Sequence, residues 1–269
     1  MLGDVVGRPG RRTVAQVLPL LREQYSPDLV IANGENAAGG LGITKDTAVA
    51  LLDAGVEVIT LGNHTWQKKD IAAFLEEETR LLRPANYPPM VPGRGSFVFK
   101  TSAGYEIGVV SLVGRTFMTP VDDPFRAADQ IVSQLRSITP IIVVDMHGEA
   151  TSEKYAMGWY LDGRVTAVIG THTHVQTCDE RILPKGTAYI TDVGMVGPID
   201  SILGLTPEIV INRFITQMPQ RWEVAGGTTA AMGVVVDFQA DGRATGIERF
   251  NLKGLAAGQE SDANGESVF

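Results

Sequence analysis

The chain has very little cysteine. Cys178 is the single cysteine among 269 residues, so the chain cannot form a disulfide within itself. One unpaired cysteine is typical of a protein from a reducing compartment, and we predict a cytoplasmic location. We interpret Cys178 as structural, because no second cysteine stands at the spacing of a metal or redox motif.

Long hydrophobic runs are also missing. No stretch approaches the roughly 20 apolar residues that a transmembrane helix needs. The first residues, MLGDVVGRPG, lack the apolar segment of a signal peptide. We therefore expect no membrane partner. The overall composition, with 44% hydrophobic and 20% charged residues, is ordinary for a globular protein.

Positive charge is scarcer than negative charge. Lysine and arginine number 23 against 31 aspartates and glutamates, which gives a formal net charge of −8. An extended nucleic-acid-binding surface needs clustered basic residues, so this balance argues against one. It does not exclude a small anionic substrate, because bound metal cations can reverse the local sign of charge.

Apolar stretches of strand length alternate with stretches of helical periodicity. We expect strands at 29–32, 56–61, 141–145, 165–169 and 187–191, and helices at 11–25, 45–54, 70–79, 126–137 and 208–218. Thr44 is a suitable N-cap for the second helix and Gly55 a suitable stop. The alternation predicts an α/β fold with packed sheet layers. Residues 231–238 and 244–250 flank the turn Ala240-Asp241-Gly242 and predict an antiparallel hairpin.

The chain is expected to consist of one domain, which contains a small insert, and a C-terminal tail. We predict one domain over residues 1–253 and a loose, small and polar tail over 254–269. The stretch RPANYPPMVPGRG at 83–95 holds four prolines and two glycines, which excludes a long regular element there. We expect it to open a small cap or insert over approximately 83–125.

Polar side chains follow the expected strands at the end where open α/β sheets bind ligands. Every one of the four histidines belongs to this group. A single histidine after a strand is usually a hydrogen-bonded loop residue, and an isolated glutamate is usually solvated. The recurrence on successive strands favours a metal site instead. The candidate residues are Asp4, Glu35, Asn36, Asn63, His64, His147, His172 and His174.

Two histidines stand one residue apart in Gly170-Thr171-His172-Thr173-His174. In an extended chain, side chains at i and i+2 point to the same side, with backbones about 6–7 Å apart. That separation suits two ions about 3.5–4 Å apart better than a single ion. A bridging carboxylate is then needed, and Glu35 is the candidate. Nitrogen and oxygen ligands without a thiolate suit iron, manganese or zinc.

Four short motifs resemble the signature of the calcineurin-like metallophosphoesterases. They are Gly3-Asp4, Gly62-Asn63-His64, His147 and the segment 170–174. The resemblance is closer to the YmdB-like branch and covers nearly the whole chain except the tail. The stretches that carry it are GDVVGRPGR (3–11), NGENAAGG (33–40), LGNHTW (61–66), LRPANYP (82–88), HGEATSEK (147–154), GTHTHVQT (170–177) and LPKGTAYITDVGMVGP (183–198).

The resemblance implies a calcineurin-like two-sheet α/β/β/α sandwich with a small cap insert. It also implies a ligand set for two transition-metal ions, with iron or manganese favoured over zinc. One ion takes Asp4, Glu35, Asn36 and His174, and the other takes Glu35, Asn63, His147 and His172. Where the wider superfamily has Asp-x-His, Asp4 is followed here by Val5 and Val6. Glu35 stands where the superfamily has an aspartate, and both departures make Asn36 an additional ligand.

The activity implied by the resemblance is a dinuclear-metal phosphodiesterase. It would hydrolyse cyclic nucleotides of the 2′,3′-cAMP or cGMP type, with a metal-bridged hydroxide as the nucleophile and His64 as the general acid. A phosphomonoesterase or 5′-nucleotidase using the same site is the first alternative. A regulatory binding protein with weak activity is the second. The resemblance is also compatible with a homo-oligomer.

Overall fold

Two β-sheets form the framework of the computed structural model, which describes residues 1–256. The first sheet has the strand order β13-β12-β11-β1-β2-β3-β4, and the second has the order β5-β6-β7-β8-β10-β9. Strands of the first sheet are β1 (Leu2–Val5), β2 (Ile31–Asn33), β3 (Val58–Thr60), β4 (Leu81–Leu82), β11 (Met195–Pro198), β12 (Thr228–Phe238) and β13 (Ala244–Ala256). Those of the second are β5 (Ser96–Lys100), β6 (Glu106–Val113), β7 (Ile141–His147), β8 (Ala167–Thr171), β9 (Arg181–Ile182) and β10 (Ala188–Ile190).

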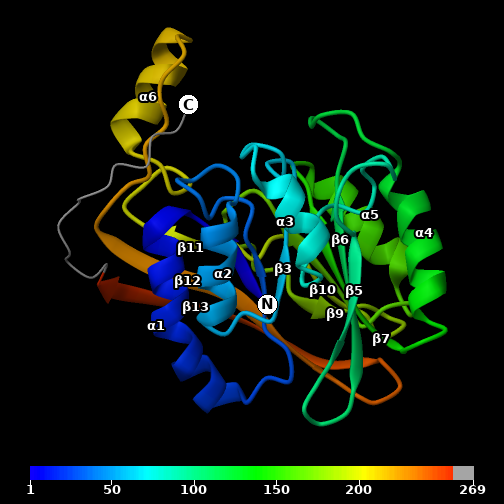
Figure 1. Cartoon of the computed structure of the whole chain (residues 1–269). Helices are drawn as coiled ribbons and strands as arrows, with labels where there is room; N and C mark the ends of the chain where they lie inside the picture. Colours follow the sequence, from blue (N-terminus) through cyan, green and yellow to red (C-terminus); the bar gives the residue numbers. More distant parts are fainter. Residues whose placement is uncertain (257–269) are drawn as a thin grey trace.

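Helices cover the outer faces of both sheets (Figure 1). The helices are α1 (Gly7–Tyr25), α2 (Lys45–Asp53), α3 (Ile71–Glu77), α4 (Pro124–Leu135), α5 (Thr151–Leu161) and α6 (Pro207–Thr216). Helices α1, α2 and α3 share a buried apolar cluster with the first sheet, and α4 and α5 share another with the second. Within the described residues, no helix is long and apolar enough to cross a membrane.

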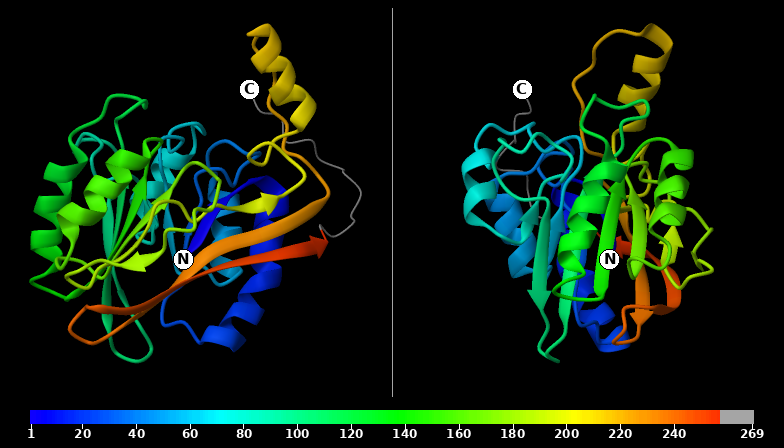
Figure 2. Two further views of the ribbon diagram at one scale, coloured as in Figure 1. Left: turned by 180° about the vertical axis from the view of Figure 1, so that it is seen from behind. Right: turned by 90° about the vertical axis from the view of Figure 1, so that its right-hand side faces the viewer.

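A third apolar layer lies between the sheets. Ile169 and Ile190 of the second sheet cluster with Val234 of the first, and Ile31 clusters with Val109. The order helix, sheet, sheet, helix confirms the predicted α/β/β/α sandwich (Figure 2). Because apolar side chains cover both faces of each central strand, these strands appear in the sequence as continuous apolar runs.

Local signals in the sequence account for several helix ends. The Thr44 side chain accepts a hydrogen bond from the Thr47 amide in a capping box at the start of α2, as predicted. Gly55 follows that helix with a φ of 107°, a conformation that favours glycine. Helix α5 was not predicted. Its buried face includes Glu153 and Lys154, so its apolar residues lack the helical spacing of a surface helix.

Two segment predictions are corrected by the structure. Residues 83–125, expected to form a small cap, supply β5 and β6, and β6 pairs with β7 from Ile107 to Val113 inside the second sheet. The predicted start of the tail, at residue 254, is also too early, because β13 continues to Ala256. The rest of that tail lies outside the described residues.

The parallel strands bring their carboxyl ends to one edge of the sandwich. β1, β2 and β3 run parallel in the first sheet, and β6, β7 and β8 run parallel in the second. β1 is short but pairs with both β11 and β2, which fixes the position of Asp4. The loops after these strands therefore meet between the two sheets, and they carry the candidate residues.

Gly170 has no room for a side chain. A Cβ atom at this position would lie 1.7 Å from the Thr191 carbonyl oxygen, which is backbone and cannot move aside. We expect Gly170→Ala to lower the free energy of unfolding by about 1–3 kcal/mol or more, the cost of overpacking. Urea unfolding of chelator-treated protein measures this. Gly226→Ala is the matched control, because a Cβ atom there meets nothing within 4 Å. Equal urea midpoints for the two variants would contradict the packing argument.

Candidate metal centre

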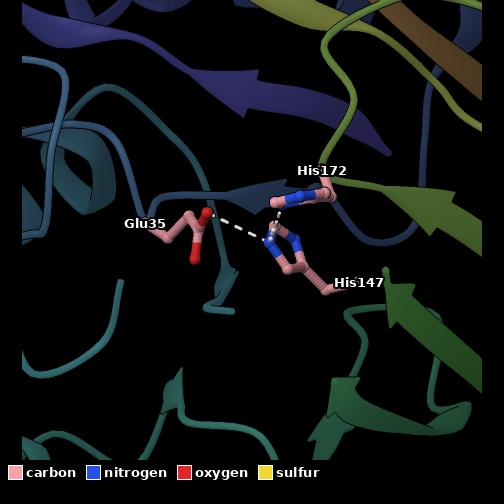
Figure 3. A group of neighbouring side chains, drawn as sticks. All are labelled: Glu35, His147 and His172. Carbon is pink, nitrogen blue, oxygen red and sulfur yellow. Dashed lines mark hydrogen bonds and ion pairs between the residues drawn. The ribbon is translucent and has the colours of Figure 1, made fainter. Parts of the chain in front are cut away.

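The ring nitrogen Nε2 of His147 is the centre of the site. His147 ends β7 and is fully buried. Three atoms lie 3.0 Å from this nitrogen: Glu35 Oε1, Asn63 Oδ1 and His172 Nδ1. Figure 3 shows Glu35 and His172 facing His147 from two different loops. A single ring proton can serve one of these acceptors, whereas a cation among them is contacted by all. The structure thus brings together the four residues predicted for the second ion.

The residues predicted for the first ion lie beside this group. His174 Nε2 is 2.9 Å from the Asn36 amide nitrogen and 3.8 Å from Asp4 Oδ1. Asp4 comes from β1, whereas Asn36 and Glu35 come from the loop after β2. All eight candidate residues therefore meet at the carboxyl ends of β1, β2, β3, β7 and β8, although these strands belong to two sheets.

Two carboxylate oxygens in the site are buried and make no hydrogen bond, and their nearest partners are histidine ring nitrogens. They are Asp4 Oδ1 and Glu35 Oε1. A buried polar atom without a partner is costly and rare, so such an atom points to a bound ion or another missing partner. Together with imidazole nitrogens and amide oxygens, these oxygens form a donor set that suits transition-metal ions. The residues present therefore fit a metal centre.

The histidine rings are oriented by groups outside the predicted ligand set. His174 Nδ1 lies 2.9 Å from the Leu203 carbonyl oxygen, and His172 Nε2 lies 3.1 Å from Glu149 Oε2. A partner on the outer nitrogen fixes the ring tautomer and turns the inner nitrogen toward the metal position. Glu149 was missed from the sequence, although it stands two residues after His147, in the loop that follows β7.

The loop of His172 and His174 is not extended, and this corrects the expectation that both rings face one side. His172 has a φ of 101° and His174 a φ of 63°, both in the region that non-glycine residues avoid. The turn sends His172 toward His147 and His174 toward Asn36. One histidine therefore reaches each half of the site, which a straight segment could not achieve.

A buried ion pair holds this turn in place. Lys154 Nζ lies 2.9 Å from Asp192 Oδ2 and donates to the Thr171 carbonyl oxygen at 3.1 Å. Asp192 Oδ2 in turn accepts from the Thr173 amide at 3.0 Å, between the two histidines. Neither charged residue was singled out from the sequence. Their pairing stabilises backbone angles that the loop would otherwise avoid.

His64 is placed differently from the other three histidines. Its Nδ1 lies 2.9 Å from Asn36 Oδ1, and its backbone amide donates to Glu35 Oε2 at 2.9 Å. Its Nε2 has no hydrogen-bond partner among the described residues. The side chain is 27% exposed, in contrast to the fully buried His147. His64 is therefore fixed at one nitrogen and open at the other.

The surroundings shift the pKa values of the two central histidines, His147 and His172, in opposite directions. Burial alone would lower the pKa of His147, but the charges of Glu35, Asp4 and Asp145 outweigh it and raise this pKa to about 9. Burial and the neighbouring charged His147 lower the pKa of His172 to about 3. Burial also raises the pKa of Asp4 to about 6. Without metal, His147 is thus the counter-ion of the buried carboxylates.

Comparison with known proteins gives matches over most of the chain. The family model described as YmdB-like protein matches residues 1–250. A relative from Bacillus subtilis (strain 168), named 2′,3′-cyclic-nucleotide 2′-phosphodiesterase, is 53% identical over 236 residues, which cover 88% of this chain and 89% of the relative.

Two solved structures are similar in fold and sequence. A hypothetical protein from Thermus thermophilus has a TM-score of 0.88 and 44% identity, covering 94% of this chain and 98% of its own. A protein from Mycoplasma pneumoniae, described as a novel phosphatase, has a TM-score of 0.88 and 36% identity, covering 95% of this chain and 92% of its own.

Metal binding should release a proton from His147. The pKa of about 9 keeps this ring protonated at pH 7, whereas a metal ligand must be the neutral ring. The affinity for Mn²⁺ should therefore rise about tenfold per pH unit from pH 7 to about 8.5 and level off above the pKa. Titration calorimetry in buffers of different ionisation enthalpy measures the released proton. Binding without proton release, and with the same affinity at pH 7 and 8.5, would show that the ring is neutral beforehand.

Proposed function

Because the chain belongs to the YmdB-like family, we propose that it is a metal-dependent phosphodiesterase that hydrolyses 2′,3′-cyclic nucleotides. One observation carries the proposal: three acceptors lie 3.0 Å from the buried His147 Nε2, and one of them, Glu35 Oε1, makes no hydrogen bond, as is also true of the nearby Asp4 Oδ1. The name of the Bacillus subtilis relative supports the substrate class, and the Mycoplasma pneumoniae structure, described as a phosphatase, supports hydrolysis of phosphate esters.

Two sets of residues would hold two metal ions that share Glu35. Asp4, Asn36 and His174 complete one set, and Asn63, His147 and His172 complete the other. The donor set suits iron, manganese or zinc, and the family resemblance favours iron or manganese. When bound, two such cations neutralise phosphate charge and lower the pKa of a water molecule that can attack phosphorus. This explains how a chain with a net charge of −8 could bind an anionic substrate.

His64 would supply the proton for the leaving oxygen. Attack by water on the cyclic diester breaks the bond between phosphorus and the 2′ oxygen, and that oxygen must take up a proton. The Nδ1 atom of His64 is engaged by Asn36, so the open Nε2 is the atom that can donate. A cyclic diester keeps its leaving oxygen tethered to the product, so a donor held in one place suits this substrate.

Two alternatives have weaker support. A phosphomonoesterase or 5′-nucleotidase would use the same donor set, and the description of one similar structure as a phosphatase favours it. A regulatory binding protein with weak activity would have no need of so many converging acceptors. Homo-oligomer formation and a cytoplasmic location stay predictions from the sequence.

The substrate proposal predicts chelator-sensitive hydrolysis of 2′,3′-cyclic AMP. Purified protein loaded with Mn²⁺ should convert it to the 3′-monophosphate and should stop after treatment with a chelator. The same preparation should act far more slowly on 5′-AMP, because a monoester offers no tethered leaving oxygen. Product chromatography measures both rates. Faster release of phosphate from 5′-AMP would favour the nucleotidase alternative.

Replacement of His64 should separate proton donation from metal binding. We expect His64→Ala to lower kcat on 2′,3′-cyclic AMP by about 10²–10⁴-fold, the usual contribution of a general acid. Its metal content, measured by elemental analysis, should stay that of the wild type. Gln67→Ala, an exposed change on the same loop, is the matched control. A His64→Ala enzyme as fast as the control would remove His64 from the chemistry.

A further inference from the structure

A fully buried carboxyl group lies behind the metal centre and belongs to neither predicted ligand set. Asp145 stands two residues before His147 on β7 and is 1% exposed. Its Oδ1 accepts from the Thr171 hydroxyl at 2.7 Å. Its Oδ2 accepts from the Thr60 hydroxyl at 2.5 Å and from the Asn33 amide at 3.1 Å. A buried acidic group with three donors is well satisfied, and one of those donors leads directly to His147.

We propose that Asp145, acting through Thr171, holds the proton of His147 on Nδ1 and so keeps Nε2 free as a metal ligand. This inference rests on the metal centre of the proposed function and concerns two residues that would not touch metal or substrate. Asp145 and Thr171 are positioning residues, and their effect reaches the site through the ring of His147.

Counting protons identifies the direction of each hydrogen bond. A threonine hydroxyl has one proton, and that of Thr171 goes to Asp145. The hydroxyl oxygen can then only accept from His147 Nδ1, which lies 2.9 Å away. His147 must therefore carry a proton on Nδ1. The chain from carboxylate to hydroxyl to imidazole runs in one sense only, because the Thr171 hydroxyl, the Thr60 hydroxyl and the Asn33 amide all donate to Asp145.

Asn33 does not offer an alternative acceptor to His147. Its Oδ1 accepts from the Glu35 amide at 3.1 Å, which turns its Nδ2 toward Asp145. This Nδ2 is also 3.4 Å from His147 Nδ1, longer than the contact with Thr171. Because an amide nitrogen only donates, Asn33 cannot accept the Nδ1 proton of His147, and its shorter contact, at 3.1 Å, assigns its own donation to Asp145.

The opposite tautomer would damage the site. A proton on Nε2 would occupy the point that Glu35, Asn63 and His172 surround at 3.0 Å, and would remove the lone pair that a metal needs. Asp145 collects its donors from β2, β3 and β8, in both sheets. These donors hold the Asp145 carboxylate between the two sheets, and of the two threonine hydroxyls only that of Thr171 also contacts the ring of His147.

Two threonines give a matched test, because Thr60 and Thr171 each donate to Asp145 but only Thr171 contacts His147. We expect Thr171→Val to weaken Mn²⁺ binding by about 10–100-fold, the usual effect of losing a partner of a ligating histidine. Thr60→Val should lose a comparable buried hydrogen bond and keep the wild-type affinity. Thr171→Ser, which retains the hydroxyl, should restore binding. Titration of chelator-stripped protein measures the affinities, and urea unfolding measures the loss of stability in each variant.

Equal losses of affinity in Thr171→Val and Thr60→Val would overturn the inference and reduce the network to structural support. Full affinity in Thr171→Val would overturn it as well.

The wild type provides a measurement that does not depend on the folding of any variant. With four histidines in the chain, nitrogen-15 spectra of Zn²⁺-loaded protein can assign each ring. We expect His147 to show a slowly exchanging Nδ1 proton and zinc at Nε2. Zinc at Nδ1 would refute the proposal.

These outcomes are separable from those of the proposed function. A chain that binds metal as described but does not hydrolyse cyclic nucleotides would lose the proposed substrate and keep the positioning role of Asp145. A wild-type chain that binds no metal would overturn both.

Discussion

The buried Glu35 carboxylate is the constraint on which the rest of the site depends. Its Oε2 accepts from the His64 amide, whereas its Oε1 makes no hydrogen bond and has two ring nitrogens beside it, His147 Nε2 at 3.0 Å and His64 Nδ1 at 3.3 Å. An ionised carboxylate in the interior is costly unless a positive charge lies beside it. A charged His147 provides that charge when metal is absent, and metal ions would provide it when present. Either way, the positive charge must come from outside the loop that carries Glu35.

This requirement explains why the site needs both sheets. Glu35 and Asn36 follow β2, and Asn63 and His64 follow β3, all in the first sheet. His147 and the loop of His172 and His174 come from β7 and β8 of the second. The apolar layer between the sheets brings these two groups of residues together. Packing of that layer therefore sets the distances between the candidate ligands of the first sheet and those of the second. Two features that cost free energy lie at the same edge of the sandwich. They are the positive φ angles of His172 and His174 and the buried ion pair of Lys154 and Asp192.

Much of this arrangement follows from the sequence because its signals are local. The central strands are apolar runs, α2 has a threonine cap and a glycine stop, and the candidate ligands come directly after strands. Residues 83–125 were misjudged because prolines and glycines at 83–95 conceal the strands that follow. The network around Asp145 was missed for a different reason. A buried aspartate, threonine or lysine has no distinctive neighbours in the sequence, and its partners come from other strands.

The central claim is that the converging acceptors hold two metal ions that share Glu35. The most direct test is a crystal structure of Mn²⁺-loaded protein with anomalous diffraction data collected at the manganese edge. Our account predicts two anomalous peaks on either side of the Glu35 carboxylate. One should be bound by Asn63, His147 and His172, and the other by Asp4, Asn36 and His174. Peaks elsewhere on the chain, or none in protein that retains its fold, would contradict it.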